Sequence, residues 1–102
     1  MDRDIQIDFD WDPEKAAENL RKHGVVFEEA ATIFLDPFAA SLLDEDHSDD
    51  EERWITQGRA SSGRLLVVSH TFFEIPGVEI RVRLISARPA KRHERKQYED
   101  KA

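Results

Sequence analysis

The sequence predicts an α+β domain with an antiparallel sheet, and its elements follow the order β-α-α-β-β-β-β-α. Three observations support this class. An alternation of period two near the start favours a strand, helical spacing of apolar residues comes next, and strand-like segments separated by turn residues fill the second half. A chain of 102 residues has room for one domain, residues 1–102, with one modest core.

The first third of the chain predicts one strand and two helices. Residues 5–11 alternate between apolar and polar side chains, which indicates a short strand. Asp12-Pro13 favours a helix start, because Asp caps exposed amides and Pro suits the first turn. Gly24 is typical of a left-handed helix end. A second helix, ended by Asp36-Pro37, is predicted by apolar residues three, four and seven apart: Phe27, Ala30, Ala31 and Phe34.

Four strands and a last helix are expected in the remainder. The candidate strands are residues 38–43, 54–58, 64–71 and 80–88, separated by the acidic run 44–52 and by turns at 61–63 and 75–77. The apolar run 65–68 predicts a central strand that is covered on at least one face. In the last strand, Ile80, Val82 and Leu84 share one face, and Arg81 and Arg83 share the other with Ile85. Pro89 suits the first turn of a basic helix, which we expect from about residue 89 to 99.

Charge is strongly segregated along this acidic chain, whose net charge is −7. Residues 1–52 contain four basic and 17 acidic side chains, whereas residues 53–102 contain 11 basic and five acidic ones. This asymmetry indicates a basic surface for a polyanion and an acidic surface for a different partner. The alternative is that the two halves neutralise each other in the folded protein.

Composition also limits the cellular setting. The chain has no cysteine, which excludes disulfides and thiolate metal sites and favours the reducing cytoplasm. The start of the sequence lacks the basic and apolar regions of a signal peptide, and no apolar run approaches the ~20 residues that a membrane span needs. We therefore expect a cytoplasmic protein without a membrane segment.

Arginines on or beside successive strands are the main candidates for chemistry. Antiparallel pairing can gather several on one face, from the set Arg59, Arg64, Arg81, Arg83 and Arg88. The guanidinium group is always charged and matches phosphate oxygens, so a cluster can bind an RNA backbone and stabilise charge on a phosphate. The last helix adds Lys91, Arg92, Arg95 and Lys96. Tyr98 in that helix suits base stacking or proton donation, and equally suits anchoring the helix to the core.

The histidines allow two interpretations each. His70 is in phase with Leu66 and Val68, which fits a core histidine bonded to backbone as well as a proton-transfer residue. Lys22-His23 suits a helix C-terminus and is also a candidate pair for proton transfer. His47 lies among carboxylates that superficially resemble a metal loop, but without an orderly ligand pattern a solvated hairpin tip is favoured.

Short motifs spread over nearly the whole chain resemble, in this order and spacing, those of the BrnT toxin family, small bacterial toxins of the RelE-like superfamily. They are Phe9-Asp10-Trp11-Asp12, Lys15-Ala16, Asn19, Lys22-His23-Gly24-Val25, Phe27-Glu28-Glu29-Ala30, His47-Ser48, Glu52-Arg53, Gly58, Arg64-Leu65-Leu66-Val67-Val68, His70-Thr71, Arg83-Leu84-Ile85-Ser86-Ala87-Arg88, Glu94 and Tyr98. Val26 departs from the pattern, because a helix-capping Ser is expected there.

The resemblance implies a compact RelE-like fold with helices packed on a twisted antiparallel sheet. It implies a metal-independent endoribonuclease that needs no cofactor and inhibits translation, in which the ribose 2′-OH attacks the adjacent phosphate. It also implies a BrnA-like antitoxin with a ribbon-helix-helix domain, which binds the toxin and represses the shared promoter DNA.

We therefore expect a toxin of a type II toxin–antitoxin system. Arg64, Arg83 and Arg88 are expected to clamp phosphates, with His70 or Tyr98 in proton transfer. Arg59 and the basic helix, through Lys91, Arg92, Arg95 and Lys96, are expected to guide RNA. The alternative is a non-catalytic nucleic-acid-binding module that acts as a co-repressor with a partner. A purely structural interaction domain leaves the segregated charge unexplained.

Overall fold

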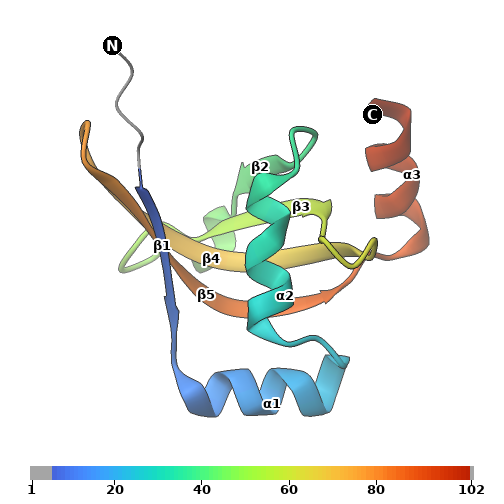
Figure 1. Ribbon diagram of the computed structural model, residues 1–102, viewed down its shortest axis with the longest axis horizontal. Coiled ribbons are helices and arrows are strands. Elements are labelled where there is room, and N and C mark those ends of the chain that lie inside the picture. Colours follow the sequence, from blue (N-terminus) through green and yellow to red (C-terminus); the bar gives the residue numbers. More distant parts are fainter. Residues whose placement is uncertain (1–5, 102) are drawn as a thin grey trace.

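The computed structural model describes residues 6–101, and its elements confirm the predicted order and class (Figure 1). They are β1 (Gln6–Trp11), α1 (Pro13–His23), α2 (Phe27–Ala31), the 3-10 helix η1 (Thr32–Leu35), β2 (Ala40–Leu43), the 3-10 helix η2 (Glu45–His47), β3 (Trp54–Arg59), β4 (Leu65–Ile75), β5 (Glu79–Pro89) and α3 (Arg92–Lys101). The expected strand start at Ile5 and the sequence features of the first residues lie outside the described part.

The five strands form one sheet in the order β1-β5-β4-β3-β2. The pairs β5–β4, β4–β3 and β3–β2 are antiparallel, as expected for successive strands, while β1 pairs with β5 in parallel. The parallel pair differs from the expected sheet, which was antiparallel throughout. No hairpin joins β1 to β5, so no tight turn forces these two strands to run in opposite directions. The long β4 is central, and its apolar run 65–68 is buried as predicted, whereas its last residues, 72–75, are exposed.

The two faces of the sheet are covered by different helices. On one face, Phe27, Ala30 and Ile33 of α2 and η1 pack on Leu66 and Val68 of β4. Gly58 of β3 allows η1 to approach closely, since a Cβ at this position would lie 3.1 Å from the Ile33 Cβ. The preceding residue, Gln57, faces the other way and donates a 2.7 Å hydrogen bond to the Glu94 carbonyl of α3. We call the face that α3 covers in part the outer face.

A β-bulge in β5 decides which arginines reach the outer face. Ser69 pairs with Ser86 and His70 pairs with Leu84, so Ile85 is an extra residue without a partner in β4. The alternation therefore shifts by one, and both Leu84 and Ala87 are buried in the core. Arg83 and Arg88 consequently lie on the outer face together, although an uninterrupted strand would place them on opposite faces.

Local signals explain the boundaries of α1 and α2. Asp12 caps α1 by accepting from the Glu14 N–H, and Gly24 ends it with a φ of 68°. The amide of Asn19 joins this helix to the sheet, because it donates to the Ala87 carbonyl and accepts from the Ala87 N–H, both at 2.9 Å. Val26 provides no side-chain cap, and α2 ends after five residues, where η1 continues it.

The last helix begins later than expected. β5 extends to Pro89, so α3 starts at Arg92 instead of near residue 89. Among the described residues, no helix is long and apolar enough to cross a membrane.

Candidate functional site

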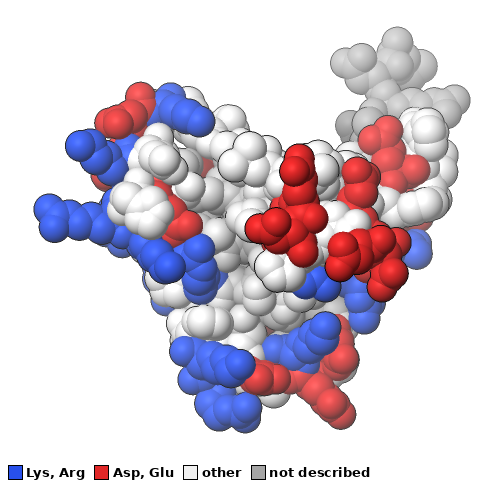
Figure 2. All heavy atoms as spheres, turned by 180° about the vertical axis from the view of Figure 1, so that it is seen from behind, with Lys and Arg blue, Asp and Glu red and all other residues white. Residues whose placement is uncertain are grey.

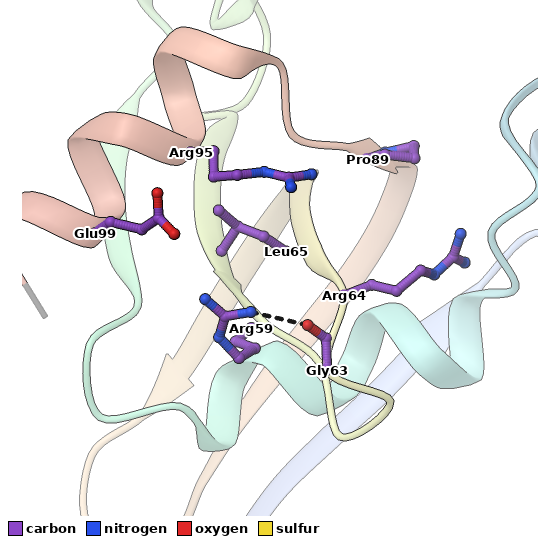
Figure 3. A pocket seen from close by; sticks show the side chains of 7 residues that line it. All are labelled: Arg59, Gly63, Arg64, Leu65, Pro89, Arg95 and Glu99. Atoms are coloured by element: carbon purple, nitrogen blue, oxygen red, sulfur yellow. Dashed lines mark hydrogen bonds between the residues drawn. The ribbon is translucent and has the colours of Figure 1, made fainter.

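Three arginines surround a pocket of about 300 Å³ where the ends of β3 and β4 meet α3 (Figure 3). Its lining residues are Arg59, Gly63, Arg64, Leu65, Pro89, Arg95 and Glu99. Arg59 is the last residue of β3, Leu65 is the first of β4, and Arg95 lies in the first half of α3. The antiparallel pair β3–β4 and the packing of α3 on the outer face therefore gather positive charge that is dispersed in the sequence.

Arg59 and Arg95 are the two arginines of this pocket that lack an acidic partner. No carboxylate of residues 6–101 lies within 4.0 Å of either guanidinium group. Figure 3 shows Arg95 extending over Leu65, with Arg59 on the other side of that leucine. Arg59 donates to the Gly63 carbonyl at 2.9 Å, and its guanidinium carbon lies 5.3 Å from the centre of the Tyr98 ring. The site thus offers two cations for an anion, of which Arg59 is held by its contacts with Gly63 and Tyr98 and Arg95 is exposed on α3.

Asp36, which follows η1, fixes the position of Arg59 and Tyr98. One carboxylate oxygen accepts from the Tyr98 hydroxyl at 2.6 Å and from the Arg59 backbone N–H at 2.8 Å. Burial acts to raise the pKa of Asp36, but hydrogen bonds from Tyr98 and from two backbone N–H groups outweigh it, so this pKa is lowered. The same hydrogen bond raises the pKa of Tyr98. The Tyr98 proton is therefore held by Asp36, a state that suits anchoring better than proton donation.

Arg64 is committed to a structural ion pair at the edge of the pocket. Its guanidinium contacts both oxygens of Glu29, at 2.6 and 2.9 Å, and donates to the Gly24 carbonyl at 3.0 Å. These bonds join the start of β4 to the connection between α1 and α2, and they lower the pKa of Glu29. Arg64 was expected to clamp a phosphate, but its Nε and Nη2 are occupied by these bonds. Only its Nη1 has no partner among the described residues.

Arg88 is held in a similar way by Glu94. Two parallel hydrogen bonds of 2.8 and 2.9 Å join the guanidinium to the carboxylate, and Glu94 also accepts from the Lys91 N–H at 2.7 Å. The hydrogen bonds from Arg88 lower the pKa of Glu94 to about 2. This pair closes the connection from β5 to α3, so Arg88 contributes to the site by positioning the helix that contains Arg95.

Two expected catalytic residues lie away from the pocket. Arg83 forms an exposed ion pair with Asp10 of β1 at 3.3 Å and does not line the pocket. His70 is 3% exposed on the helix-covered face, edge-on to Phe34 and 2.6 Å from the Thr56 hydroxyl. Burial lowers the pKa of His70, which favours the neutral ring. The core interpretation of His70 thus fits this structure, and RNA cannot contact the ring without a rearrangement.

The remaining basic residues form an exposed rim. Arg92, Arg95 and Lys96 surround a shallow hollow on α3 with Glu99, and Lys91 is exposed just before the helix. Lys22 forms an exposed pair with Glu18 at 3.0 Å, and His47 pairs with Asp44 at 2.9 Å. Within residues 6–101, no group of three or more His, Cys, Asp or Glu side chains is arranged to hold a metal ion.

The sequence does not indicate Asp36 or Glu99 as site residues, and it does not indicate that Arg59 and Arg95 share one pocket. Asp36 is indicated only as a helix end, because its partners are 23 and 62 residues away in the chain. Glu99 is the one carboxylate among the residues that line the pocket. No local pattern indicates either contact. Arg95 and Glu99 are four residues apart in α3 and therefore lie on the same side of the helix. This spacing is the one sequence signal that brings the two side chains together.

Comparisons with known proteins identify the family and the fold. The family described as "Ribonuclease toxin, BrnT, of type II toxin-antitoxin system" matches residues 11–94. The crystal structure of the Brucella abortus ribonuclease toxin BrnT is similar in fold, with a TM-score of 0.58 and 19% identity over 86% of this chain and 100% of that chain. A comparison with curated protein sequences finds no match.

Proposed function

The chain belongs to the BrnT family of ribonuclease toxins of type II toxin–antitoxin systems, and from this premise we propose that it cleaves RNA at the Arg59–Arg95 pocket without a metal ion. The observation that supports this site most directly is the pair of guanidinium groups without acidic partners, which flank Leu65. Two guanidinium groups on either side of Leu65 match the charge of a phosphodiester, and their planar donors suit its oxygens.

The proposed reaction uses the ribose of the substrate as the nucleophile. The 2′-oxygen forms a bond to phosphorus while the bond from phosphorus to the 5′-oxygen breaks, which gives a 2′,3′-cyclic phosphate and a 5′-hydroxyl. Glu99 is the pocket carboxylate and would accept the 2′-OH proton, then return it to the leaving oxygen. Arg59 and Arg95 would stabilise the charge that develops on the phosphorane oxygens, the task that a metal ion has in other nucleases.

The other basic residues have supporting roles in this proposal. Arg64 borders the pocket with one free nitrogen and can contact a neighbouring phosphate, while Arg88 holds α3 in place through Glu94. Lys91, Arg92 and Lys96 lie exposed near or on α3 and would attract the RNA backbone at longer range. The ring of Tyr98 contacts the guanidinium group of Arg59 through a cation–π interaction.

We further propose that the toxin acts in the cytoplasm, blocks translation by RNA cleavage and is neutralised by a BrnA-like antitoxin. Its ribbon-helix-helix domain would bind the shared promoter DNA. The family's place in type II toxin–antitoxin systems supports a protein antitoxin.

The test is cleavage of a defined RNA by the purified chain in excess EDTA, with analysis of the product ends. We expect cyclic-phosphate or 3′-phosphate ends from the wild type. The Arg59→Ala, Arg95→Ala double variant should lose at least about 100- to 1000-fold in rate, the usual loss for one charge-stabilising donor. Arg81→Ala is the matched control, because Arg81 is an exposed outer-face arginine paired with Glu79 outside the pocket. It should cleave like the wild type.

Two results would contradict the proposal. A strict requirement for magnesium or products with 3′-hydroxyl ends would exclude this mechanism. A folded double variant that loses RNA affinity while the wild type shows no turnover would instead support the co-repressor alternative.

A further inference from the structure

A second cavity lies on the outer face beside the arginine pocket, and it differs from that pocket in chemistry. It has a volume of about 590 Å³ and separates α3 from β2 and the loop after β2. Ile55 and Val67 of the sheet line its floor, and Phe38, Leu42 and Leu43 line the side formed by β2. We call this cavity the outer groove.

Large apolar side chains of the outer groove are exposed in the isolated chain. Leu42 is 74% exposed and Phe38 is 52% exposed, and both belong to or precede the edge strand β2. Among the elements of residues 6–101, α3 alone covers this face of the sheet, at one end. A solvated sheet face is usually polar, so large apolar side chains exposed together in a groove mark a surface that a further element can cover.

The acidic side chains at the rim favour a polypeptide over RNA as the occupant. Asp44, Glu45 and Asp46 line the side of the groove opposite α3. Figure 2 shows acidic side chains at one side of this face, basic side chains of α3 at the other, and uncharged surface between them. A phosphate backbone would be repelled along the acidic side, whereas a polypeptide with apolar and basic side chains would complement both floor and rim.

We infer that the outer groove receives an amphipathic helix of the antitoxin, whose apolar side contacts Leu42, Phe38 and Val67 and whose Lys or Arg side chains contact Glu45 and Asp46. This inference rests on the proposed function, because it presupposes a protein antitoxin. An amphipathic helix that lays its apolar side into a hydrophobic groove is an established mode of peptide recognition. It also accounts for the acidic run of the sequence, which the RNA site does not use.

The position of the outer groove explains how such a helix blocks cleavage. Gln57 and Val67 line the groove and pair with each other, while the pair Arg59 and Leu65, two positions away on the same strands and on the same face, lines the arginine pocket. α3 forms a shared wall, with Gln97 and Tyr98 toward the groove and Arg95 and Glu99 toward the pocket. A helix in the groove therefore lies beside the bound phosphate and competes with the RNA for space.

The test uses the protein encoded by the reading frame adjacent to this chain's gene, purified and titrated into the full chain by calorimetry. Leu42→Asp should raise the Kd by about 30-fold or more, the effect of losing a central apolar anchor. Val78→Asp, at a 58% exposed position in the β4–β5 turn, is the apolar control and should bind like the wild type. Cleavage of RNA by the free Leu42→Asp chain should stay at the wild-type rate.

A pair of charge reversals isolates the acidic rim. Glu45→Lys with Asp46→Lys should raise the Kd at least about tenfold, mainly through slower association. Asp49→Lys with Asp50→Lys changes the net charge equally in the same loop, outside the groove lining, and should alter the Kd by less than about threefold because screening weakens distant charges.

The outcomes separate this inference from the proposed function. Unchanged binding by Leu42→Asp and by the rim reversal overturns the inference, whether or not the chain cleaves RNA. Lost cleavage in Leu42→Asp with unchanged binding assigns the groove to RNA and also overturns it. A wild-type chain that binds the partner through the groove but never cleaves RNA keeps the inference and refutes the proposed activity.

Discussion

The hydroxyl of Tyr98 donates a 2.6 Å hydrogen bond to the carboxylate of Asp36, which joins α3 to the end of η1 across 62 residues of sequence. The same carboxylate oxygen accepts from the backbone of Arg59, so one acidic group fixes both the aromatic ring and the arginine stacked on it. This hydrogen bond favours the anchoring role of Tyr98 over the proton-donor role, because the carboxylate holds the hydroxyl proton and raises the pKa of the tyrosine.

Tyr98→Phe is therefore expected to affect stability more than chemistry. The variant keeps the ring under Arg59 but removes the donor to Asp36, which should lower the free energy of unfolding by about 1–3 kcal/mol. Denaturant unfolding monitored by tryptophan fluorescence measures this loss, and single-turnover RNA cleavage measures the rate of chemistry. We expect a cleavage rate within about threefold of the wild type. A folded variant that cleaves more than about 100-fold slower would identify Tyr98 as a proton donor.

The sequence predicts those parts of the fold that depend on neighbouring residues. Asp12 and Gly24 mark α1, and the apolar run of β4 marks the centre of the sheet, because caps and burial depend on neighbouring residues. The sequence does not predict the bulge at Ile85, because the bulge depends on the register between β4 and β5. The same holds for the parallel pairing of β1 with β5, whose partners, such as Asp10 and Arg83, are far apart in the sequence.

For the site, the sequence predicts the types of residue but not their arrangement. Arginines on strands indicated phosphate chemistry, but their free or paired state depends on partners that only the fold supplies. Glu29 lies 35 residues from Arg64 and occupies most of its donors, whereas Arg59 has no carboxylate partner in the described chain. His70 illustrates the same limit, because its alternation with Leu66 and Val68 suits a core position and an active position equally well.

The Arg88–Glu94 pair should make stability depend on acid pH. The pKa of Glu94 is about 2 in the folded chain, below its ordinary value of 4.5, so the folded state binds the proton more weakly than the unfolded state. The resulting stabilisation, at most about 3 kcal/mol, is present above pH 4.5 and is lost as pH falls toward 2.

Chemical denaturation of wild type and Glu94→Gln at a series of pH values tests this. The variant should be less stable at neutral pH, and the difference between the two proteins should shrink as the pH falls from 4.5 toward 2. A difference that stays constant over this range would show that Glu94 has an ordinary pKa in the folded state.

His70→Gln tests the core interpretation of this histidine. A glutamine amide can keep a hydrogen bond to the Thr56 hydroxyl, but the edge-on contact of the ring with Phe34 is lost. We expect a loss of about 1–3 kcal/mol in unfolding free energy and a cleavage rate within about threefold of the wild type. The cleavage rate should also keep its wild-type pH profile. Loss of an inflection near neutral pH, together with a large fall in rate, would place His70 in proton transfer.

The exposed basic residues of α3 should act on RNA affinity and its salt dependence. Arg92 and Lys96 lie outside the pocket lining of Arg59 and Leu65, so they attract phosphates through screened charge and do not contact the reacting group. In an Arg92→Ala, Lys96→Ala variant, the slope of log affinity against log salt should fall by about 2, one for each lost phosphate contact. The single-turnover rate at saturating RNA should remain unchanged.

The matched control for this variant removes two exposed cations from α1, Lys15→Ala with Arg21→Ala, and changes the net charge by the same amount. Because α1 covers the other face of the sheet, this control should leave the salt slope close to the wild-type value. Equal slopes for both variants would mean that net charge alone governs RNA affinity. A fall in the saturated rate of the α3 variant would place Arg92 or Lys96 in contact with the scissile phosphate.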